Sequence, residues 1–488
     1  MLKKILLGLL GLFILLAAVF TINTLRLGNT QLEPSGETYT ADWDREAMLQ
    51  RFSEAIQFQT ISGDEDFETD TTEFRRFLSF IEESFPLVHS RLERRMFNEL
   101  TPLYFWEGTD PGLDPILLMG HYDVVPVDSS DIDGWNYEPF SGEIADGYVW
   151  GRGTLDNKNN VMGLLETAEY LLTNEYEPRR SIYFSFGHDE EIGGGDGAAA
   201  VAQYLREQGT NLKLLLDEGG VVLEHSPLLD QPMAVIGIAE KGYLSLELIA
   251  RTRGGHSSGP PNVMAVTELS KAILALHENQ FPARFDGTIE HMFDSVADRL
   301  PLYIRVVYAN RWVTEGLMRR LMAMSEDIAP SVRTTTAPTI LRAGVKDNVL
   351  PNEARAVVNF RLLQGDTIKM VKSRVERVID NENISVRQYG STVMEASPIS
   401  PIDGEPYLIL QQVITDQFEN VAVTPYLVSG ATDARHFTDL TDHIFRFSPN
   451  YIGTETTGIV HGTNERIGAD SYTGMIDFYS QFIRKATE

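Results

Sequence analysis

The chain has 488 residues, 43% of them hydrophobic and 23% charged, so it can bury a large core and divide into two domains, which excludes a single small module. Its 41 lysines and arginines are outnumbered by 70 aspartates and glutamates, and the net charge of −29 repels phosphate backbones, so we expect no nucleic acid partner. The chain contains no cysteine, which excludes disulfides and thiolate ligands and leaves only histidine, aspartate and glutamate to hold a metal ion.

The chain begins with an apolar segment. Lys3 and Lys4 precede a stretch from Ile5 to Ile22 that carries no charge and approaches the roughly 20 residues needed to cross hydrocarbon. The stretch is long for a cleaved signal and has a poor small-residue cleavage site, so we predict that residues 1–22 form an uncleaved membrane anchor. The protein would then lie on the non-cytoplasmic side of the membrane, with cleavage and secretion as the alternative. Residues 23–40 are predicted to be an exposed linker.

Residues 41–241 predict a largely parallel α/β sheet. Short apolar runs such as PILLMGHYD, SIYFSFG and LKLLLD alternate there with helical patterns. One predicted helix has an apolar face that would pack on the sheet, formed by Val161, Leu164, Leu165, Ala168, Leu171 and Leu172. The α/β pattern resumes over residues 396–488, with NVAVTPYLV as a strand and YTGMIDFYSQFIRKA as a closing helix.

A second domain is predicted as an insert over residues 242–395. YLSLELIAR is typical of a strand with alternating faces, and a helix follows with Val266, Leu269, Ile273 and Leu276 at helical spacing. ARAVVNFRL, a further helix and ISVRQY complete a strand–helix–strand–strand–helix–strand order, if PLYIRVVYA or nearby residues form the remaining strand. We therefore expect a compact α+β domain inserted into the α/β domain.

Polar side chains follow the predicted buried strands, at the end of the sheet where open α/β folds bind their ligands. His121 and Asp123 end the run ILLMGHYD, and the two-residue period of a strand puts both side chains on one side. Asp123 can then accept the second ring N–H of a metal-bound His121. Glu190 and Glu191 follow SIYFSFG, and because neighbouring side chains point in different directions, one can bind a metal while the other acts as a general base.

Three further positions carry carboxylate or imidazole side chains that could also bind a metal ion. Asp217 and Glu218 end LKLLLDE, Asp156 precedes the predicted helix, and His461 lies near the C-terminus beside a glycine. Taken singly, each has a structural explanation, such as a helix cap for Asp156 or a solvated loop for the acid pairs. Together they would leave uncompensated charges close to one another, and two divalent cations would resolve that conflict. Nitrogen and oxygen ligands suit Zn²⁺ best, with Co²⁺ or Mn²⁺ as alternatives.

Six motifs carry a resemblance to a known family. GHYDVVPV, WGRGTLDNK, GHDEEIGG, LLDEGG, RGGHSSGP and VHGTNERI resemble, in order and spacing, those of the dinuclear zinc peptidases of the M20 family, specifically its carboxypeptidase S and N-acyl-amino-acid hydrolase branch. The resemblance covers essentially all of the chain after the linker. It implies a zinc-peptidase catalytic domain for the α/β part and a lid or dimerisation domain for the insert.

The resemblance also implies the metal ligands. Asp156 would bridge two zinc ions, His121 would bind the first ion, and Glu191 and His461 would bind the second. The chain departs from the family's pattern at Asn157, where relatives usually have a second aspartate. That departure leaves the bridge intact and changes the charge beside it.

The remaining ligand and the catalytic residues follow in the same way. An acid of LLDEGG would complete the first metal site, either Asp217, which ends the strand, or Glu218 as the close alternative. Asp123 would orient the histidine ligand. Glu190 would be the general base that activates water.

The insert would contribute to the site as well. His256 in RGGHSSGP would stabilise the oxyanion of a catalytic site, in dimeric relatives that of the partner subunit, whereas read alone it is an exposed loop histidine. Asn348 and Arg361 occupy positions where relatives bind the substrate's carboxylate, and the planar fork of an arginine suits that task. The loop around Gly430 is expected to line the same pocket.

The sequence therefore predicts a metal-dependent hydrolase that cleaves an amide whose leaving part carries a free carboxylate. A peptide or an N-acyl amino acid would fit as substrate, and the apolar N-terminus favours the second because fatty-acyl chains partition into membranes. Synthesis of N-acyl amino acids by the reverse reaction stays open, as does a homodimer through the insert. The alternative from another class is a membrane-tethered binding protein with a degenerate, metal-free hydrolase fold.

Overall fold

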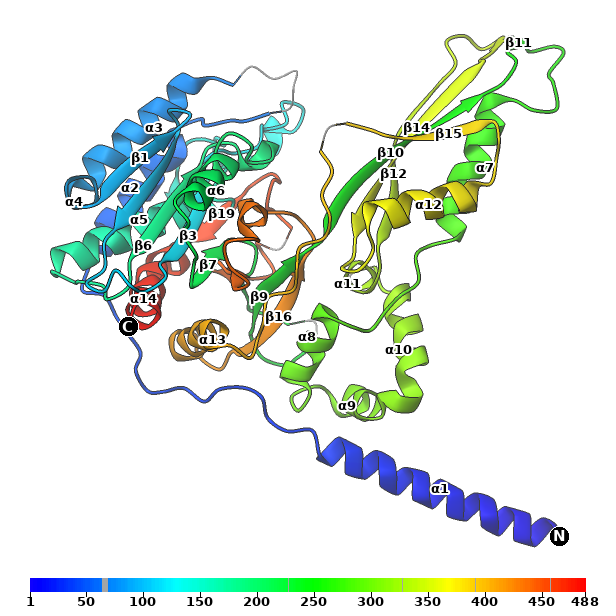
Figure 1. Ribbon diagram of the computed structural model, residues 1–488, viewed down its shortest axis with the longest axis horizontal. Coiled ribbons are helices and arrows are strands. Elements are labelled where there is room, and N and C mark those ends of the chain that lie inside the picture. Colours follow the sequence, from blue (N-terminus) through cyan, green and yellow to red (C-terminus); the bar gives the residue numbers. More distant parts are fainter. Residues whose placement is uncertain (64–68, 227, 327, 391, 457) are drawn as a thin grey trace.

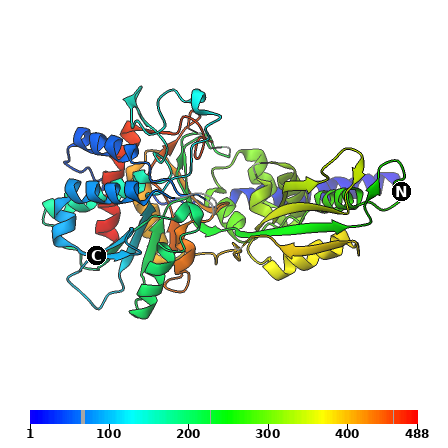
Figure 2. The same ribbon diagram turned by 90° about the horizontal axis from the view of Figure 1, so that it is seen from above.

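The computed structural model describes residues 1–63, 69–226, 228–326, 328–390, 392–456 and 458–488. Two β-sheets lie at opposite ends of an elongated molecule, and an apolar helix extends away from both (Figure 1). Seen from above, the larger sheet with its helices and the smaller sheet are joined by a narrow waist (Figure 2). The mixed α/β class predicted from the sequence is confirmed.

The large sheet is mixed, and most of its strand pairs are parallel, as the sequence predicted. Its order is β1-β2-β6-β3-β7-β17-β9-β8-β18, with β16 beside β9. Neighbours from β6 to β17 and the pair β16–β9 are parallel, whereas β1–β2, β2–β6 and β8–β9 are antiparallel. The strands are β1 (Glu93–Phe97), β2 (Thr101–Trp106), β3 (Ile116–His121), β6 (Ile182–Gly187), β7 (Leu214–Asp217), β8 (Val222–Leu223), β9 (Met233–Glu240), β16 (Ala422–Val428), β17 (Ile444–Arg446) and β18 (Tyr451–Ile452).

Helices cover both faces of the large sheet because its central strands are apolar on both sides. Ile116 and Leu118 of β3 face one core, and Leu117 and Met119 face the other. The first core is completed by α2 (Arg45–Gln57), α3 (Thr71–Ser84), α4 (Pro86–Arg91), α5 (Lys158–Thr173), α13 (Glu405–Gln417) and α14 (Ala469–Ala486). The second is completed by α6 (Ala198–Glu207) and the 3₁₀ helix η3 (Asp433–Phe437).

Helix α5 is buried more fully than its apolar stripe predicts. Every residue from Lys158 to Leu171 is buried, including the charged Glu166 and Glu169. The reason is that α14 and α2 pack on the sides of α5 that do not face the sheet. Glu166 is satisfied there by Arg51 and by the indole N–H of Trp43.

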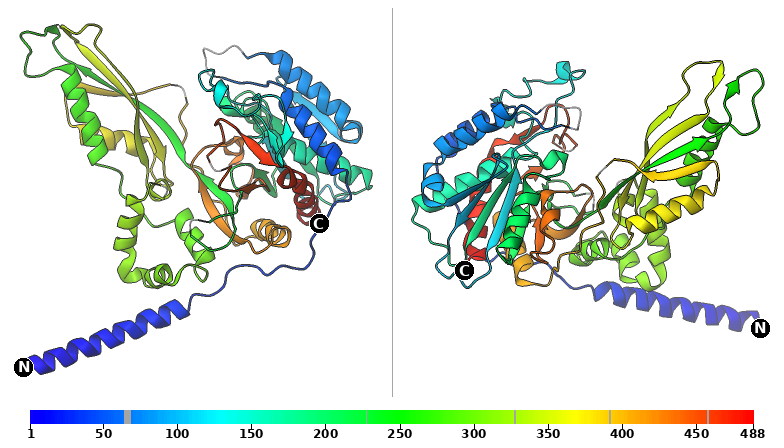
Figure 3. Two further views of the ribbon diagram at one scale, coloured as in Figure 1. Left: turned by 180° about the vertical axis from the view of Figure 1, so that it is seen from behind. Right: turned by 45° about the horizontal axis from the view of Figure 1, so that its top comes forward.

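The second sheet is antiparallel, has the order β12-β14-β10-β15, and encloses its own core with two helices. We call this group, within residues 242–388, the second sheet unit. It comprises β10 (Gly242–Arg251), α7 (Ala265–Glu278), β12 (Thr335–Ala343), β14 (Glu353–Leu362), α12 (Ile368–Ile379) and β15 (Ile384–Gln388). Its tip carries the short pair β11 (Gly255–His256) and β13 (Val349–Leu350), farthest from the large sheet in every view (Figure 3).

One predicted strand is a helix. PLYIRVVYA forms α9 (Leu302–Ala309), and the remaining strand of the second sheet unit is β12. The β-branched residues of this run allow a strand, but tertiary packing decides for a helix. The segment also contains α8 (Thr288–Val296), α10 (Arg311–Met324) and α11 (Ala329–Val332), which share a core with β9 and β16.

The apolar N-terminus forms α1 (Leu2–Leu25), the one helix among the described residues that is long and apolar enough to cross a membrane. The segment that follows is mostly exposed and contacts the large sheet at Gln31. Gln31 is buried and exchanges hydrogen bonds with both the N–H and the C=O of Val423 on β16. The short elements η1 (Ile132–Gly134), η2 (Glu190–Ile192), β4 (Ile144–Ala145), β5 (Tyr148–Trp150) and β19 (Arg466–Gly468) complete the chain.

Candidate metal centre and active site

Two groups of potential ligands meet at the carboxylate of Asp156. His121, at the end of β3, places Nε2 3.0 Å from Asp156 Oδ1 and 3.1 Å from Glu218 Oε1. His461, in a C-terminal loop, places Nε2 2.8 Å from Asp156 Oδ2 and 3.2 Å from Glu191 Oε1. Each oxygen of Asp156 therefore faces one group, which is the arrangement that a bridging carboxylate needs.

Both groups fit a divalent cation. Within each group the ligand atoms lie within 4.8 Å of one another. A single imidazole N–H cannot satisfy the two carboxylates that converge on it, because it donates one hydrogen bond at a time. A cation among these oxygens and nitrogens would satisfy all of them, and the set without sulfur suits zinc.

The structure favours Glu218 over Asp217 as the acid of LLDEGG. Asp217 turns away from His121, and its carboxylate accepts hydrogen bonds from the backbone N–H groups of Glu218 and Ala434. Of the two acids that the sequence left open, Glu218 is the one that lies beside His121 and Asp156. The backbone bends directly after β7 and carries the next side chain to the histidine.

Asp156 does not cap the following helix. The residue at the N-cap of α5 is Asn157, and its side chain makes no capping hydrogen bond. Instead, Asn157 is fully buried, and its Oδ1 accepts a hydrogen bond from the backbone N–H of His121. The asparagine at this departure from the family's pattern therefore supports the strand that carries the first histidine.

Asp123 positions more than one residue of the site. Its Oδ1 lies 3.2 Å from His121 Nδ1, as expected for an orienting carboxylate. The same carboxylate accepts the backbone N–H groups of Glu190 and Glu191, both at 3.2 Å, and the hydroxyl of Ser62 at 2.6 Å. It thereby fixes the first histidine relative to the adjacent glutamates.

Glu465 and Arg152 are functional candidates that the sequence reasoning did not single out. Glu465 Oε1 accepts hydrogen bonds from the backbone N–H groups of Gly153, Leu155 and Asp156, and its Oε2 pairs with Arg152 at 2.5 Å. Arg152 in turn donates to the carbonyl of His461 at 2.9 Å. This buried ion pair joins the loops of two second-group ligands, Asp156 and His461. Its signal was the glutamate that follows HGTN in the last motif together with the arginine of WGRGTLDNK.

Burial and charge shift the pKa values of the site. Burial raises the pKa of Glu190 well above its usual range and that of Glu218 to about 8. Hydrogen bonds to Asp156 and Glu191 raise the pKa of His461 to about 10. Burial alone would lower the pKa of His121, but the carboxylates around it, Glu218 first, raise it. Such concentrated negative charge attracts cations to this end of the sheet.

A pocket of about 460 Å³ opens onto these groups. Of the residues predicted to bind substrate, Arg361 and Gly430 line it, and the Arg361 guanidinium stacks on Tyr243, 4.7 Å from the ring centroid. Arg435 is a second cation in the lining that the sequence reasoning missed. The other lining residues include Asp156, Glu190, Glu191, Glu218, Met394 and His461.

Two predicted residues lie elsewhere. His256 and Asn348 are exposed at the tip of the second sheet unit, where the Asn348 carbonyl accepts a hydrogen bond from the N–H of Ser257. His256 Nδ1 lies 2.8 Å from the hydroxyl of Ser258, and β11 is remote from the large sheet (Figure 1). Within one chain, therefore, neither residue joins the metal ligands.

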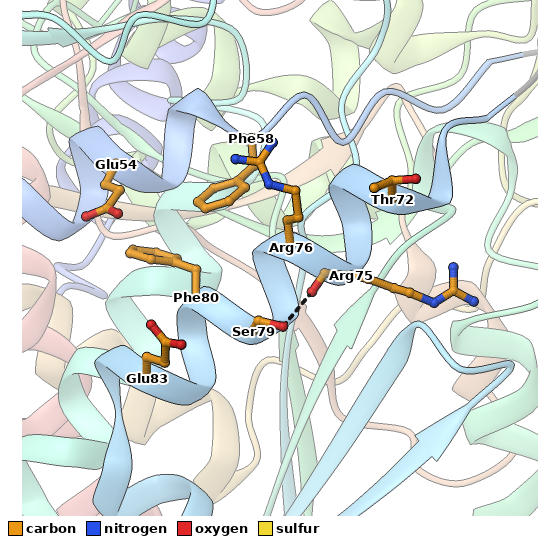
Figure 4. Close-up of a pocket in the computed structure, with 8 residues that line it drawn as sticks. All are labelled: Glu54, Phe58, Thr72, Arg75, Arg76, Ser79, Phe80 and Glu83. Carbon is orange, nitrogen blue, oxygen red and sulfur yellow. Dashed lines mark hydrogen bonds between the residues drawn. The ribbon is translucent and has the colours of Figure 1, made fainter.

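A second depression, of about 450 Å³, lies on the surface of α2 and α3 (Figure 4). Glu54, Phe58, Arg76 and Phe80 line it, and the Arg76 guanidinium lies over the Phe58 ring. It shares no lining residue with the pocket at the metal ligands. Its glutamates offer controls for substitutions in that pocket.

Comparisons with known proteins show the family of the chain. The family model described as Peptidase family M20/M25/M40 matches residues 117–485. The chain is 37% identical to a probable carboxypeptidase S-like 2 of Dictyostelium discoideum, over 96% of this chain and 91% of that protein. It is 36% identical to the N-fatty-acyl-amino acid synthase/hydrolase PM20D1 of Homo sapiens, over 91% of this chain and 88% of that protein.

Solved structures share the fold. An M20 family metallo-carboxypeptidase from Sulfolobus solfataricus superposes with a TM-score of 0.63 at 18% identity, covering 90% of this chain and 98% of that one. Human carnosine dipeptidase 1 superposes with a TM-score of 0.62 at 16% identity, covering 91% of this chain and 97% of that one.

Fold, ligand set and relatives define a metal-dependent hydrolase that acts on amide bonds. More particularly, the chain belongs to peptidase family M20/M25/M40, as the six motifs indicated. The prediction of an enzyme is confirmed, and the alternative of a degenerate binding protein is not supported.

Proposed function

We propose that this protein is a two-metal amide hydrolase that releases a product with a free carboxylate from a peptide or an N-acyl amino acid. The observation that carries the proposal is the position of Asp156, whose two oxygens face separate groups, each with one histidine and one glutamate. A shared carboxylate is the feature expected of a two-metal centre.

The ligands divide between two ions. His121, Glu218 and Asp156 would hold one Zn²⁺, and Glu191, His461 and Asp156 would hold the other, with Co²⁺ or Mn²⁺ as substitutes. When bound, the ions lower the pKa of water and polarise the scissile carbonyl. Asp123 and the Glu465–Arg152 pair keep the ligands oriented for that task.

Glu190 supplies the general base. It lines the pocket, and its Oε2 lies 4.0 Å from His121 Nε2, so it faces the first ligand group without belonging to either. Its carboxylate accepts the proton of the attacking water and passes it to the leaving nitrogen. Burial raises its pKa, and this makes the carboxylate a stronger base than an exposed glutamate.

The substrate class follows from the pocket and from the relatives. Arg361 and Arg435 are the cations of the lining that can pair with a free carboxylate, and Arg361 is held in place by Tyr243. The names of the relatives, carboxypeptidase S-like and N-fatty-acyl-amino acid synthase/hydrolase, support both candidate substrates. Because a hydrolase also catalyses the reverse reaction, condensation of an acid with an amino acid belongs to the same proposal.

The location of the protein is part of the proposal. We infer that α1 anchors the chain in a membrane, with Lys3 and Lys4 on the cytoplasmic side and the enzyme on the other, and secretion after cleavage is the alternative. We also infer that residues 41–241 and 396–488 form the catalytic domain, and that residues 242–395 form a lid that can mediate dimerisation.

Substitution of the general base tests the mechanism. Glu190→Gln should keep both metal ions and lower kcat by about 10²–10⁴-fold, because the amide cannot accept the proton. Turnover of N-acyl amino acids and dipeptides would be measured alongside the metal content by plasma mass spectrometry.

Glu83→Gln, in the depression on α3, is the matched control and should change neither quantity. Full activity in Glu190→Gln would exclude this general base, and fewer than two ions in the parent protein would exclude the two-metal centre.

A further inference from the structure

Helices α9 and α10 expose an unusual number of large apolar side chains. Seven of them are between 54% and 73% exposed: Leu302 and Tyr303 on α9, and Trp312, Val313, Leu317, Leu321 and Met324 on α10. We call this group the α9–α10 apolar face. Its members come from two consecutive helices, so they are more concentrated than the apolar residues scattered over every surface.

On α10 the exposed apolar residues recur at helical spacing. Val313, Leu317, Leu321 and Met324 follow at intervals of four, four and three residues, so they lie on one side. Met318 and Met322, which lie on the opposite side, are buried in the core beneath. The helix therefore has two apolar sides, and its own fold uses one of them.

The face begins where the apolar helix α1 ends. Asn310, the residue between α9 and α10, accepts a hydrogen bond from the Asn23 side chain at 2.9 Å and donates one to the Phe20 carbonyl at 3.3 Å. Asn310 and Thr24 are both buried at this contact. The last turn of α1 is thus fixed against α9, and both lie on the same side of the molecule (Figures 1 and 3).

This contact sets the depth of the face in a bilayer. If α1 crosses the membrane, the turn that contains Phe20 and Thr24 lies at the far boundary of the hydrocarbon, since the 24 residues of α1 match its thickness. The α9 end of the face, which adjoins this contact, is then at the level of the headgroups. Tyr303 is a residue type that favours this layer, because its ring is apolar and its edge polar.

The charge of the two helices agrees with that position. Between Leu302 and Met324 there are four arginines and one glutamate, a net +3 in a chain of −29. Arg311 pairs with Glu290 and Asp294 of α8 and Arg319 with Glu315, whereas Arg320 lies among the exposed apolar residues. A long arginine in that place can keep its stem in apolar surroundings while its guanidinium reaches lipid phosphates.

We propose that the α9–α10 apolar face inserts into the outer headgroup layer of the bilayer that α1 crosses, with a preference for anionic lipids. An amphipathic surface of this kind settles about 5–10 Å into the boundary between headgroups and acyl chains. The partner is taken to be the bilayer because the face adjoins the end of α1 that would leave the membrane. The inference rests on the proposed anchor and adds a second, separate membrane contact.

Site-specific probes test this contact in the full chain. Because the natural chain has no cysteine, Leu317→Cys introduces a single labelling site for an environment-sensitive fluorophore. The labelled protein would be reconstituted in phosphatidylcholine vesicles with and without phosphatidylglycerol. We expect a blue-shifted emission that is quenched by lipids carrying a nitroxide close to the headgroup, more strongly with phosphatidylglycerol. Leu274→Cys on α7, where the native leucine is 53% exposed, is the matched control and should stay unquenched.

A third variant separates this inference from the anchor itself. Leu12→Cys, in the middle of α1, should be quenched most by nitroxides deep in the acyl chain. If Leu12→Cys behaves so while Leu317→Cys is quenched no more than Leu274→Cys, the anchor stands and the proposed contact is wrong. A blue shift at position 317 without quenching by lipid would assign the face to a second copy and also overturn the proposal. Loss of quenching at position 12 would refute the anchor and, with it, the inference.

Discussion

Glu465 acts on the site through other residues. Its carboxylate holds three backbone N–H groups of the loop that carries Asp156, while its partner Arg152 holds the carbonyl of His461. The ion pair is fully buried, and burial raises the pKa of Glu465 to about 7. Two ligands of the second group therefore depend on one carboxylate that touches no metal.

We expect Glu465→Gln to weaken metal binding at the second group about 10–100-fold, the usual effect of losing an orienting partner. The amide fits the same space but presents an NH₂ group to donors and leaves Arg152 without its counter-charge. Zinc titration should resolve one weakened site, and excess zinc should restore kcat.

Glu455→Gln, whose native side chain is 71% exposed in the same C-terminal segment, is the control. Unchanged metal affinity in Glu465→Gln, with an unchanged melting temperature, would contradict the positioning role.

At the scale of single residues, the sequence predicted which residues lie in the site better than it predicted the directions of their side chains. The motifs brought His121, Asp156, Glu190, Glu191 and His461 to one place, as the geometry has them. They could not decide between Asp217 and Glu218, because successive side chains diverge and the bend after β7 is set by tertiary contacts. They also missed Glu465 and Arg152, whose roles are made by hydrogen bonds to distant backbone.

Strands β9 and β10 connect the two sheets, and Lys241 lies at their junction. Lys241 is only 2% exposed, and its Nζ donates to the carbonyls of Pro330 and Arg333 at 2.7 and 3.0 Å. Burial lowers its pKa to about 7, with Arg361 and Arg333 acting in the same direction and Asp366 against it. The junction therefore contains a lysine that is easier to deprotonate in the folded state.

This lysine makes stability depend on pH. The unfolded chain holds the proton up to about pH 10.5, whereas the folded chain releases it near pH 7, so stability rises as pH rises between these values. We expect the free energy of unfolding of the parent protein, compared with Lys241→Met, to increase from pH 7 to pH 10 in urea titrations. Lys271→Met, whose native side chain is 69% exposed, should show no such difference. An equal pH dependence in parent and Lys241→Met would exclude this origin.

At the scale of elements, periodicity predicted most helices and strands of the large sheet but failed within residues 279–340. Leu302–Ala309 has the β-branched content of a strand and yet forms α9, because its partners are helices. The true strand β12 is largely exposed and so lacks a clear apolar alternation. Propensity is weak wherever an element is only partly buried.

The two sheets enclose separate cores, and this separation keeps His256 from the metal ligands of its own chain. A catalytic role for His256 therefore requires a second copy that brings its own β11 to the pocket, or a closing movement at the β9–β10 junction. A symmetric dimer would supply two such contacts at once.

Co-expression of two inactive variants separates these routes. In a dimer of Glu190→Gln with His256→Ala, one site combines an intact Glu190 with an intact His256 from the partner, so activity should return. Each variant alone should have low kcat, and analytical ultracentrifugation would establish the dimer. No recovery in verified mixed dimers would place His256 in its own chain's site or outside the reaction.

By itself the sequence determined the class of fold, the order of the ligand motifs, the absence of thiolate chemistry and the apolar N-terminus. These depend on residue types and local spacing, which are properties of short segments. The tertiary structure decided which acid faces His121, how Glu465 joins two loops, and where α1 leaves the protein. Each of those rests on contacts between distant residues, such as Gln31 with Val423, 392 positions apart, which no local pattern encodes.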